Sequence, residues 1–191
     1  MPEDQQLVKE ILDGSQAAME VLTRKYYKAI FAYVYRKVGN RETAYDLTQE
    51  IFIKVFQRIQ SYSNKGKFSS WLYSIAVNHC RDYWRSSDFK QISKQAALNE
   101  AFVCEQNNVP YIFERKEVRE QVKTAVDSLP DFQREVVILK YFHHFKIKEI
   151  ADVTDSNVST VKSRLHQGLG KLAKLLKRGV EDENQKTTPY I

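Results

Sequence analysis

Apolar residues recur every three or four positions along most of the chain, which is the spacing of helices with one buried face. The stretches with this period lie at residues 7–12, 18–35, 44–59 and 68–83, and again at 118–129, 132–142, 147–153 and 157–176. Only 6 glycines and 4 prolines occur among 191 residues, which leaves few turns for an all-β fold. The sequence therefore predicts an all-α protein.

The helical period is lost between residues 88 and 113. This stretch is rich in Gln, Asn, Ser and Ala, and it is long for a connection inside a compact domain. We therefore expect two small helical domains joined by a flexible linker, with the domains at residues 1–87 and 114–180 and the linker at 88–113, holding at most one short helix. Residues 181–191 are polar and are expected to form a frayed tail.

The charge distribution favours a nucleic-acid partner. The chain has 30 Lys+Arg against 24 Asp+Glu, and the basic residues concentrate between residues 157 and 178, where no acidic residue occurs. Such an excess attracts a polyanion, although a solvated helix face is the plain alternative. No apolar run approaches the roughly 20 residues that span a bilayer, and the acidic N-terminus is unlike a signal peptide. We expect a cytoplasmic protein.

The sequence offers little support for an enzyme. Cys80 and Cys104 lack metal-ligand spacing, and the side chains of His143 and His144 would point apart on a helix. Cys80 lies beside His79 in sequence only, so no nucleophile is paired with a base. We expect no catalytic residue, no metal site and no cofactor. A redox role for the two cysteines is left open, because nothing in the sequence fixes their distance.

Residues 147–176 have the layout of a helix-turn-helix: a short helix, a polar turn and a basic second helix. Asn157 is predicted to cap the second helix. Four apolar residues of that helix are expected to face the core: Val161, Leu165, Leu169 and Leu172.

The opposite face of this second helix carries short hydrogen-bonding groups mixed with cations, which suit base edges and phosphates. These residues are Ser159, Thr160, Lys162, Ser163, His166 and Gln167, with Arg164 to one side as a predicted phosphate contact. A charged surface helix in a bundle is the alternative.

In the first domain, one helix face combines two acids, an amide and an aliphatic side chain that the core does not need. Asp46, Gln49, Glu50 and Ile53 lie three or four positions apart and share this face. The combination is typical of a protein-docking surface, and a plain solvated face remains the alternative.

The loop at 61–67 and the helix that follows it could hold an unstacked base near a phosphate backbone, through an aromatic ring, an amide and cations. The candidates are Tyr62, Ser63, Asn64, Lys65 and Lys67 in the loop, and Asn78, Arg81 and Arg85 on the helix. Aromatic residues inside helical domains usually pack in the core, so we expect Phe68 and Trp71 to be buried. Tyr62, in the loop, is expected to be available for stacking.

Three motifs in order along the chain resemble the extracytoplasmic-function (ECF) group of bacterial sigma factors. The first, similar to the polymerase-docking helix of that group, is Ala44-Tyr45-Asp46-Leu47-Thr48-Gln49-Glu50-Ile51-Phe52. The second, similar to its promoter-melting helix, comprises Phe68, Trp71-Leu72, Ile75-Ala76, Asn78, Asp82 and Arg85. The third, similar to its final helix-turn-helix, comprises Leu129-Pro130, Arg134-Glu135, Glu149-Ile150-Ala151 and residues 160–166. The match covers nearly all of residues 7–178.

The resemblance implies a two-domain specificity subunit of RNA polymerase. Its first domain would bind the clamp helices of the polymerase β′ subunit through Asp46, Gln49 and Glu50. It would also melt the minus-ten element, with residues 63–67 and Asn78 holding a flipped base. Its second domain would bind the minus-thirty-five element beside the β flap, through a set of polar residues with two lysines nearer the phosphates: Lys162, Ser163, His166 and Gln167, with Lys140 and Lys148.

The resemblance also implies partners. Core RNA polymerase and promoter DNA are expected, together with an anti-sigma factor that is commonly membrane-bound. No homo-oligomer is expected, whereas a helix-turn-helix regulator of the ordinary kind would be a dimer on a palindromic site. The acidic pattern from Asp46 to Phe52 argues against that alternative.

The chain departs from the family pattern at two places. Thr154, Asp155 and Ser156 stand where the family has an aliphatic residue, a turn glycine and another aliphatic, although Asp tolerates a left-handed turn. Gln167 and Gly168 stand where Arg and Ala are usual. Gly168 and Gly170 are each expected to weaken the second helix by roughly 1 kcal/mol relative to Ala.

Overall fold

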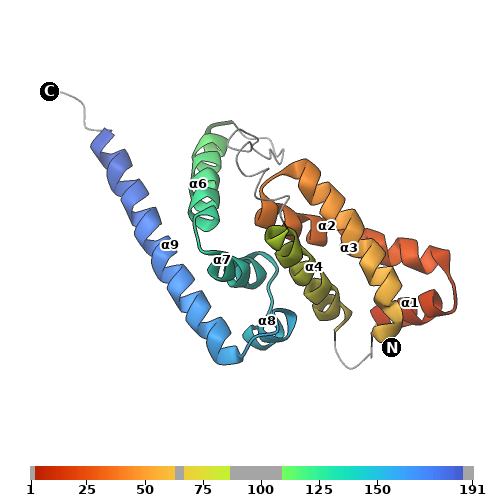
Figure 1. Ribbon diagram of the computed structural model, residues 1–191. Helices are drawn as coiled ribbons and strands as arrows, with labels where there is room; N and C mark the ends of the chain where they lie inside the picture. Colours follow the sequence, from red (N-terminus) through yellow and green to blue (C-terminus); the bar gives the residue numbers. More distant parts are fainter. Residues whose placement is uncertain (1–2, 63–66, 87–108, 187–191) are drawn as a thin grey trace. The chain divides into compact units, whose positions relative to one another are not determined.

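The computed structural model describes residues 3–62, 67–86 and 109–186, and it describes the side chains of these residues except at 109–117 and 178–186. Every element formed by the described residues is a helix or a helical turn (Figure 1). The prediction of an all-α protein is therefore confirmed. The chain divides into two compact units, Met1–Glu100 with Phe145–Ser156, and Ala101–His144 with Asn157–Ile191.

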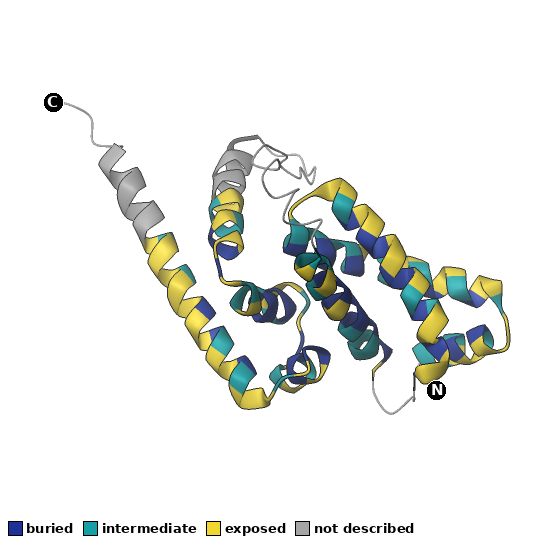
Figure 2. Cartoon of the chain, viewed as in Figure 1, coloured by how far each residue is buried: buried dark blue, intermediate teal, exposed yellow. Residues whose placement is uncertain are grey.

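The first unit is built around three longer helices, α2 (Gln16–Val38), α3 (Arg41–Arg58) and α4 (Phe68–Arg85). The helix α2 packs against α3 and α4, α3 packs against α4, and the short helix α1 (Glu3–Leu12) packs against α2. A 3-10 turn, Ile59–Ser61, follows α3, and α8 (Ile147–Val153) lies against α4. Buried and exposed residues alternate along α3 and α4 with the period that the sequence predicts (Figure 2).

Local sequence signals set the helix ends in this unit. Gly14 and Gly39 have φ angles of 92° and 78°, in the left-handed region that glycine adopts at little cost. Ser15 and Asn40 follow them, and the side chain of each accepts a hydrogen bond from a backbone N–H three residues later. The periodic stretches that the sequence shows at 7–12, 18–35 and 44–59 therefore belong to three separate helices.

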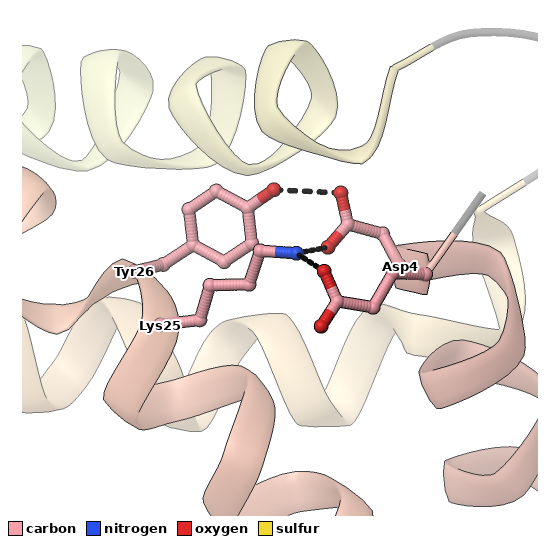
Figure 3. Close-up of polar contacts among 4 residues, drawn as sticks. Asp4, Lys25 and Tyr26 are labelled. Carbon is pink, nitrogen blue, oxygen red and sulfur yellow. Dashed lines mark hydrogen bonds and ion pairs between the residues drawn. The ribbon is translucent and has the colours of Figure 1, made fainter.

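Polar contacts attach the first turn of α1 to α2 (Figure 3). Lys25 Nζ lies 2.6 Å from Glu3 Oε2 and 2.8 Å from Asp4 Oδ1, and the Tyr26 hydroxyl donates to Asp4 Oδ2 at 2.8 Å. Burial and the Asp4 carboxylate raise the pKa of Tyr26 well above its ordinary value, so this phenol stays a donor. The N-terminal helix is thereby fixed at its polar end, while Val8 and Ile11 bury its apolar side.

The second unit contains α6 (Val109–Asp127), α7 (Asp131–Val137), a π-helical turn (Ile138–Phe142) and α9 (Val158–Lys186). The helix α9 packs against α6 and α7. Val161 and Leu165 of α9 are buried, as predicted, and Leu172 is half-buried.

The prediction that Leu169 faces the core is wrong, because 38% of this residue is exposed. Gly168 takes the position against α7 instead. A Cβ placed on Gly168 would lie 3.2 Å from Val137 Cγ2, which is closer than side chains normally approach. The neighbouring helix reaches the backbone of α9 at this point, and Leu169 is turned away from it.

Two helix ends differ from the expected domain limits. The helix α6 begins at Val109, inside the stretch expected as linker, with Pro110 in its first turn, where the N–H that proline lacks would have no partner. The helix α9 continues to Lys186, so the part of the expected frayed tail at 181–186 is helical. No proline or glycine interrupts the chain there before Pro189. Residues 87–108 and 187–191 lie outside the described residues.

The turn between α8 and α9 has the left-handed residue that the sequence predicts. Asp155 has a φ angle of 49°, and its neighbour Thr154 is buried and bonds to the Ile150 carbonyl. The helix α9 begins at Val158, directly after Asn157, whose carbonyl accepts from the Val161 N–H. A side-chain cap from Asn157 stays a prediction.

The two glycines of α9 provide a matched test of the α7–α9 contact. We expect Gly170→Ala to raise the free energy of unfolding by roughly 1 kcal/mol, because alanine favours the helix and nothing lies near the added Cβ. Gly168→Ala should gain less or lose stability, because Val137 must move. Urea unfolding of the full chain measures both changes, and equal gains at the two positions would contradict the close approach.

Candidate functional site

One side of α3 is exposed and carries the predicted docking residues. Asp46, Gln49, Glu50 and Ile53 are all exposed, Ile53 to 56%. The other side of the same helix is buried and includes Ala44, Leu47, Ile51 and Val55. The core therefore orients the four side chains outward on a common face, which we call the docking face. An exposed isoleucine beside two carboxylates suits a protein partner with an apolar contact and cations.

A histidine that the sequence analysis did not select lies behind this face. His79 of α4 is 8% exposed; its Nε2 lies 2.9 Å from Glu50 Oε2, and its Nδ1 lies 2.7 Å from Lys54 Nζ. The available signal was the period of α4, which places His79 on the buried stripe of Leu72, Ile75 and Ala76. A polar residue on an apolar stripe needs partners, and α3 supplies a hydrogen bond at Nδ1 from Lys54 and a nearby carboxylate at Nε2 from Glu50.

The expectation that Tyr62 is available for stacking is wrong. Tyr62 is 8% exposed, and its ring centroid lies 5.5 Å from that of Phe68 and 5.4 Å from that of Trp71. Burial raises the pKa of its hydroxyl. Packing against the two aromatic residues at the start of α4 stabilises the Tyr62 ring more than exposure to water would. The ring is therefore buried, although Tyr62 lies beside a polar loop. Phe68 is buried as predicted, whereas Trp71 is only half-buried.

The other predicted minus-ten residues are distributed along α4 and the loop before it. Ser63, Asn64 and Lys65 lie outside the described residues. Lys67, Asn78 and Arg85 are exposed, and Arg81 is half-buried.

Two of these basic residues, Lys67 and Arg81, contact residues in and directly after α8. Lys67 Nζ lies 2.7 Å from Glu149 Oε1, and Arg81 Nη1 donates to the Thr154 carbonyl at 3.2 Å. The contact with Lys67 and the backbone N–H of Lys146 lower the pKa of Glu149. Lys67 and Arg81 therefore meet a carboxylate and a carbonyl in this structure.

The predicted groove-reading residues lie on the first turns of α9. Five of them are exposed and Thr160 is half-buried; the exposed ones are Ser159, Lys162, Ser163, His166 and Gln167. The Gln167 amide is ordered by two contacts, because it accepts from Gln133 Nε2 at 2.9 Å and donates to Ser163 Oγ at 3.3 Å. Lys148, on α8, is exposed, and Lys140, in the π-helical turn, is half-buried.

Arg164 lies at the side of this surface, as expected, and it is half-buried. Its guanidinium lies 4.6 Å from the centre of the Phe132 ring, which is a cation–π contact with α7. The ring thus fixes where the guanidinium lies.

Two family models match the chain, Sigma-70 region 2 at residues 22–89 and Sigma-70 region 4 at residues 119–172. The ECF RNA polymerase sigma factor SigW of Bacillus subtilis (strain 168) is 30% identical over 177 residues, which cover 89% of this chain and 95% of that protein. The chain belongs to the ECF sigma factors.

This ECF sigma factor is thus a subunit for transcription initiation, with a DNA-binding helix-turn-helix in region 4, and not an enzyme. Its family typically serves stress responses, and membership implies binding to RNA polymerase. The ECF RNA polymerase sigma-E factor of Escherichia coli (strain K12) is also 30% identical, over 85% of this chain and 88% of that protein.

Two solved structures share the fold at 20% sequence identity. CnrH, in complex with the cytosolic domain of CnrY, has a TM-score of 0.66 and matches 92% of this chain and 97% of that chain. The sigma factor RpoE from Bartonella quintana, in complex with the anti-sigma factor NepR, has a TM-score of 0.64 and matches 83% of this chain and 96% of that chain.

Among the described residues, no group of three or more His, Cys, Asp or Glu could hold a metal ion. Within the same ranges, no helix is long and apolar enough to cross a membrane. Cys80 is buried, and Cys104 lies outside the described residues.

The buried position of Tyr62 has a consequence for stability without any DNA. We expect Tyr62→Ala to lower the free energy of unfolding by about 3 kcal/mol, because it removes a buried ring that packs against both Phe68 and Trp71. Tyr45→Ala, at a tyrosine that is 50% exposed, should change it by less than about 1 kcal/mol. Chemical denaturation of the full chain compares the two variants. Equal small effects would mean that Tyr62 is not part of the core.

Proposed function

We propose that the docking face of α3 binds the clamp helices of the polymerase β′ subunit. The observation that carries this proposal is the exposed Ile53 beside Asp46 and Glu50, on a helix whose other side is fully committed to the core. A monomeric domain gains nothing from such an isoleucine, whereas a cationic partner surface with an apolar centre would cover it. The face also lies within the match to Sigma-70 region 2.

The helix α4 and the loop before it are proposed to open and hold the minus-ten element. Asn78 would contact the flipped base together with residues 63–65, and Lys67, Arg81 and Arg85 would contact the backbone. Separating duplex DNA costs about 1.4 kcal/mol per stacked step, so the polymerase must share that cost. Capturing one unstacked base biases the equilibrium toward the open strand. Tyr62, being buried, is left out of this contact.

The first half of α9 is proposed to read the minus-thirty-five element in the major groove. Its exposed face supplies donors, acceptors and one cation at helical spacing, from residues Ser159, Thr160, Lys162, Ser163, His166 and Gln167. Arg164, Lys140 and Lys148 would contact phosphates, with the β flap beside this domain. The domain would span residues 114–180 and be joined to the first domain, residues 1–87, by the linker. Tethering raises the effective concentration of the second DNA contact once the first has formed.

An anti-sigma factor, anchored in the membrane, is proposed as a further partner. Support comes from the two solved relatives, of which RpoE is bound to an anti-sigma factor and CnrH to the cytosolic domain of CnrY. We also propose that the chain works in the cytoplasm as a monomer. A dimeric regulator binds DNA together with a second copy of itself, whereas this chain would bind DNA together with polymerase.

Transcription with purified core polymerase tests the docking proposal. We expect run-off transcription from discrete promoters, and we expect the double variant Asp46→Lys, Glu50→Lys to abolish it by placing cations against a cationic clamp. Glu20→Lys is the matched control, because Glu20 is also exposed on a helix, pairs with Arg24 one turn later, and lies outside the docking face. Circular dichroism shows whether the three chains remain equally helical. Retained transcription by the double variant would remove the clamp assignment.

Binding of duplex DNA by the isolated chain should be weak and strongly dependent on salt. About six phosphate contacts lose roughly three orders of magnitude in affinity between 50 and 200 mM salt. Fluorescence anisotropy with a promoter fragment, at several salt concentrations, measures this slope. Tight, sequence-specific binding at physiological salt without polymerase would contradict the proposal that polymerase is needed.

A further inference from the structure

We propose that His79 is a positioning residue of the docking face, which fixes the carboxylate of Glu50 from behind through a chain of contacts with Lys54. This inference rests on the docking function proposed above. It adds a residue that touches no partner itself and acts through one that does.

The geometry of the three side chains carries the proposal. Glu50 and Lys54 are one turn apart on α3, and the imidazole of His79 comes from α4 to lie against both. Lys54 Nζ lies 2.7 Å from Nδ1, and Glu50 Oε2 lies 2.9 Å from Nε2. The ring therefore connects the ammonium group to the carboxylate and couples α4 to the docking helix.

The chemistry of the contacts selects one form of the ring. An ammonium group has donors only, so Nδ1 must accept from Lys54, and in a neutral imidazole the proton is then on Nε2, facing Glu50. A second proton, on Nδ1, would face the lysine and break the chain. The neutral ring with Nε2–H is the form compatible with both neighbours: Nδ1 accepts a hydrogen bond from Lys54, and the proton on Nε2 faces the Glu50 carboxylate in a 2.9 Å electrostatic contact that falls outside hydrogen-bond geometry.

The charges around the ring agree with this form. Among the described residues, the charged groups that face His79 are Lys54 and Glu50 of α3 and Asp82 of α4. Burial and the nearby Lys54 lower the pKa of His79, whereas Glu50 and Asp82 raise it, and the net direction is downward. The ring is consequently neutral around pH 7.

An ordered Glu50 matters because its side chain is 56% exposed. A glutamate of that exposure otherwise samples several rotamers, and binding must select one of them. The His79 side chain is 8% exposed, so the surrounding core restricts its ring. Its contact with Glu50 therefore favours one direction of the Glu50 carboxylate before a partner binds. The docking face is to that extent preorganised.

A double-mutant cycle measures whether His79 acts through Glu50. We expect His79→Leu to weaken binding of the full chain to core polymerase about tenfold in the wild type and less than about twofold in a Glu50→Ala background. His79→Gln should restore most of the affinity, because its amide can accept from Lys54 and donate to Glu50. His144→Asn, at an exposed histidine in the other unit, should leave the affinity unchanged.

The outcomes separate the two proposals. If the wild type binds core polymerase and His79→Leu weakens binding equally with and without Glu50, His79 has only a structural role and the positioning proposal is wrong. If the wild type does not bind core polymerase at all, the docking function fails, and the positioning role fails with it. Urea unfolding of each variant shows whether the chain still folds, and His79→Gln keeps the test valid should the leucine variant unfold.

A second readout does not involve polymerase. ¹⁵N NMR of the histidine rings in the full chain should show His79 as the neutral Nε2–H tautomer at pH 7. Lys54→Met should raise the pKa of His79, because it removes the cation beside Nδ1. A proton on Nδ1, or a pKa that does not change in the lysine variant, would overturn the chain of contacts even if polymerase binds.

Discussion

The burial of one side of α3 against α2 and α4 is the constraint on which the rest of the first unit depends. Ile51 and Val55 are fully buried, and a helix that commits one side to the core must present the opposite side to solvent. The outward direction of the docking face is therefore a consequence of core packing, and the role proposed for His79 is limited to ordering the Glu50 side chain on that face. The same packing brings α4 against α3, so that His79 reaches Glu50 and Lys54.

Much of this fold is local and could be predicted from sequence. The helix limits in the first unit follow from Gly14, Ser15, Gly39 and Asn40, whose conformations depend on neighbours within a few residues. The left-handed conformation of Asp155 likewise depends on residues close to it in the sequence. The outward direction of Asp46, Gln49, Glu50 and Ile53 follows from helix period alone, because the apolar residues between them define the buried side.

What could not be predicted depends on contacts between elements that are distant in sequence. The polar sequence around Tyr62 indicates an exposed loop side chain, but Phe68 and Trp71 bury its ring. Leu169 fits the apolar period of α9, yet the close approach of Val137 to Gly168 sets which residues face α7. His79 was missed because its partners lie on another helix, 25 residues and more away in sequence. Periodicity identifies which residues of a helix are buried, but it does not identify which residues of other helices contact a polar side chain among them.

The two kinds of contact made by the candidate DNA cations differ in one physical respect. Lys67 lies against a carboxylate, and the pair as a whole carries no net charge. Arg164 lies over the uncharged ring of Phe132, and a cation–π contact of this kind restrains a guanidinium without cancelling its charge. A cation ordered by an aromatic ring and a cation ordered by a carboxylate thus differ in the charge of the pair, and only the first kind of pair attracts an approaching polyanion.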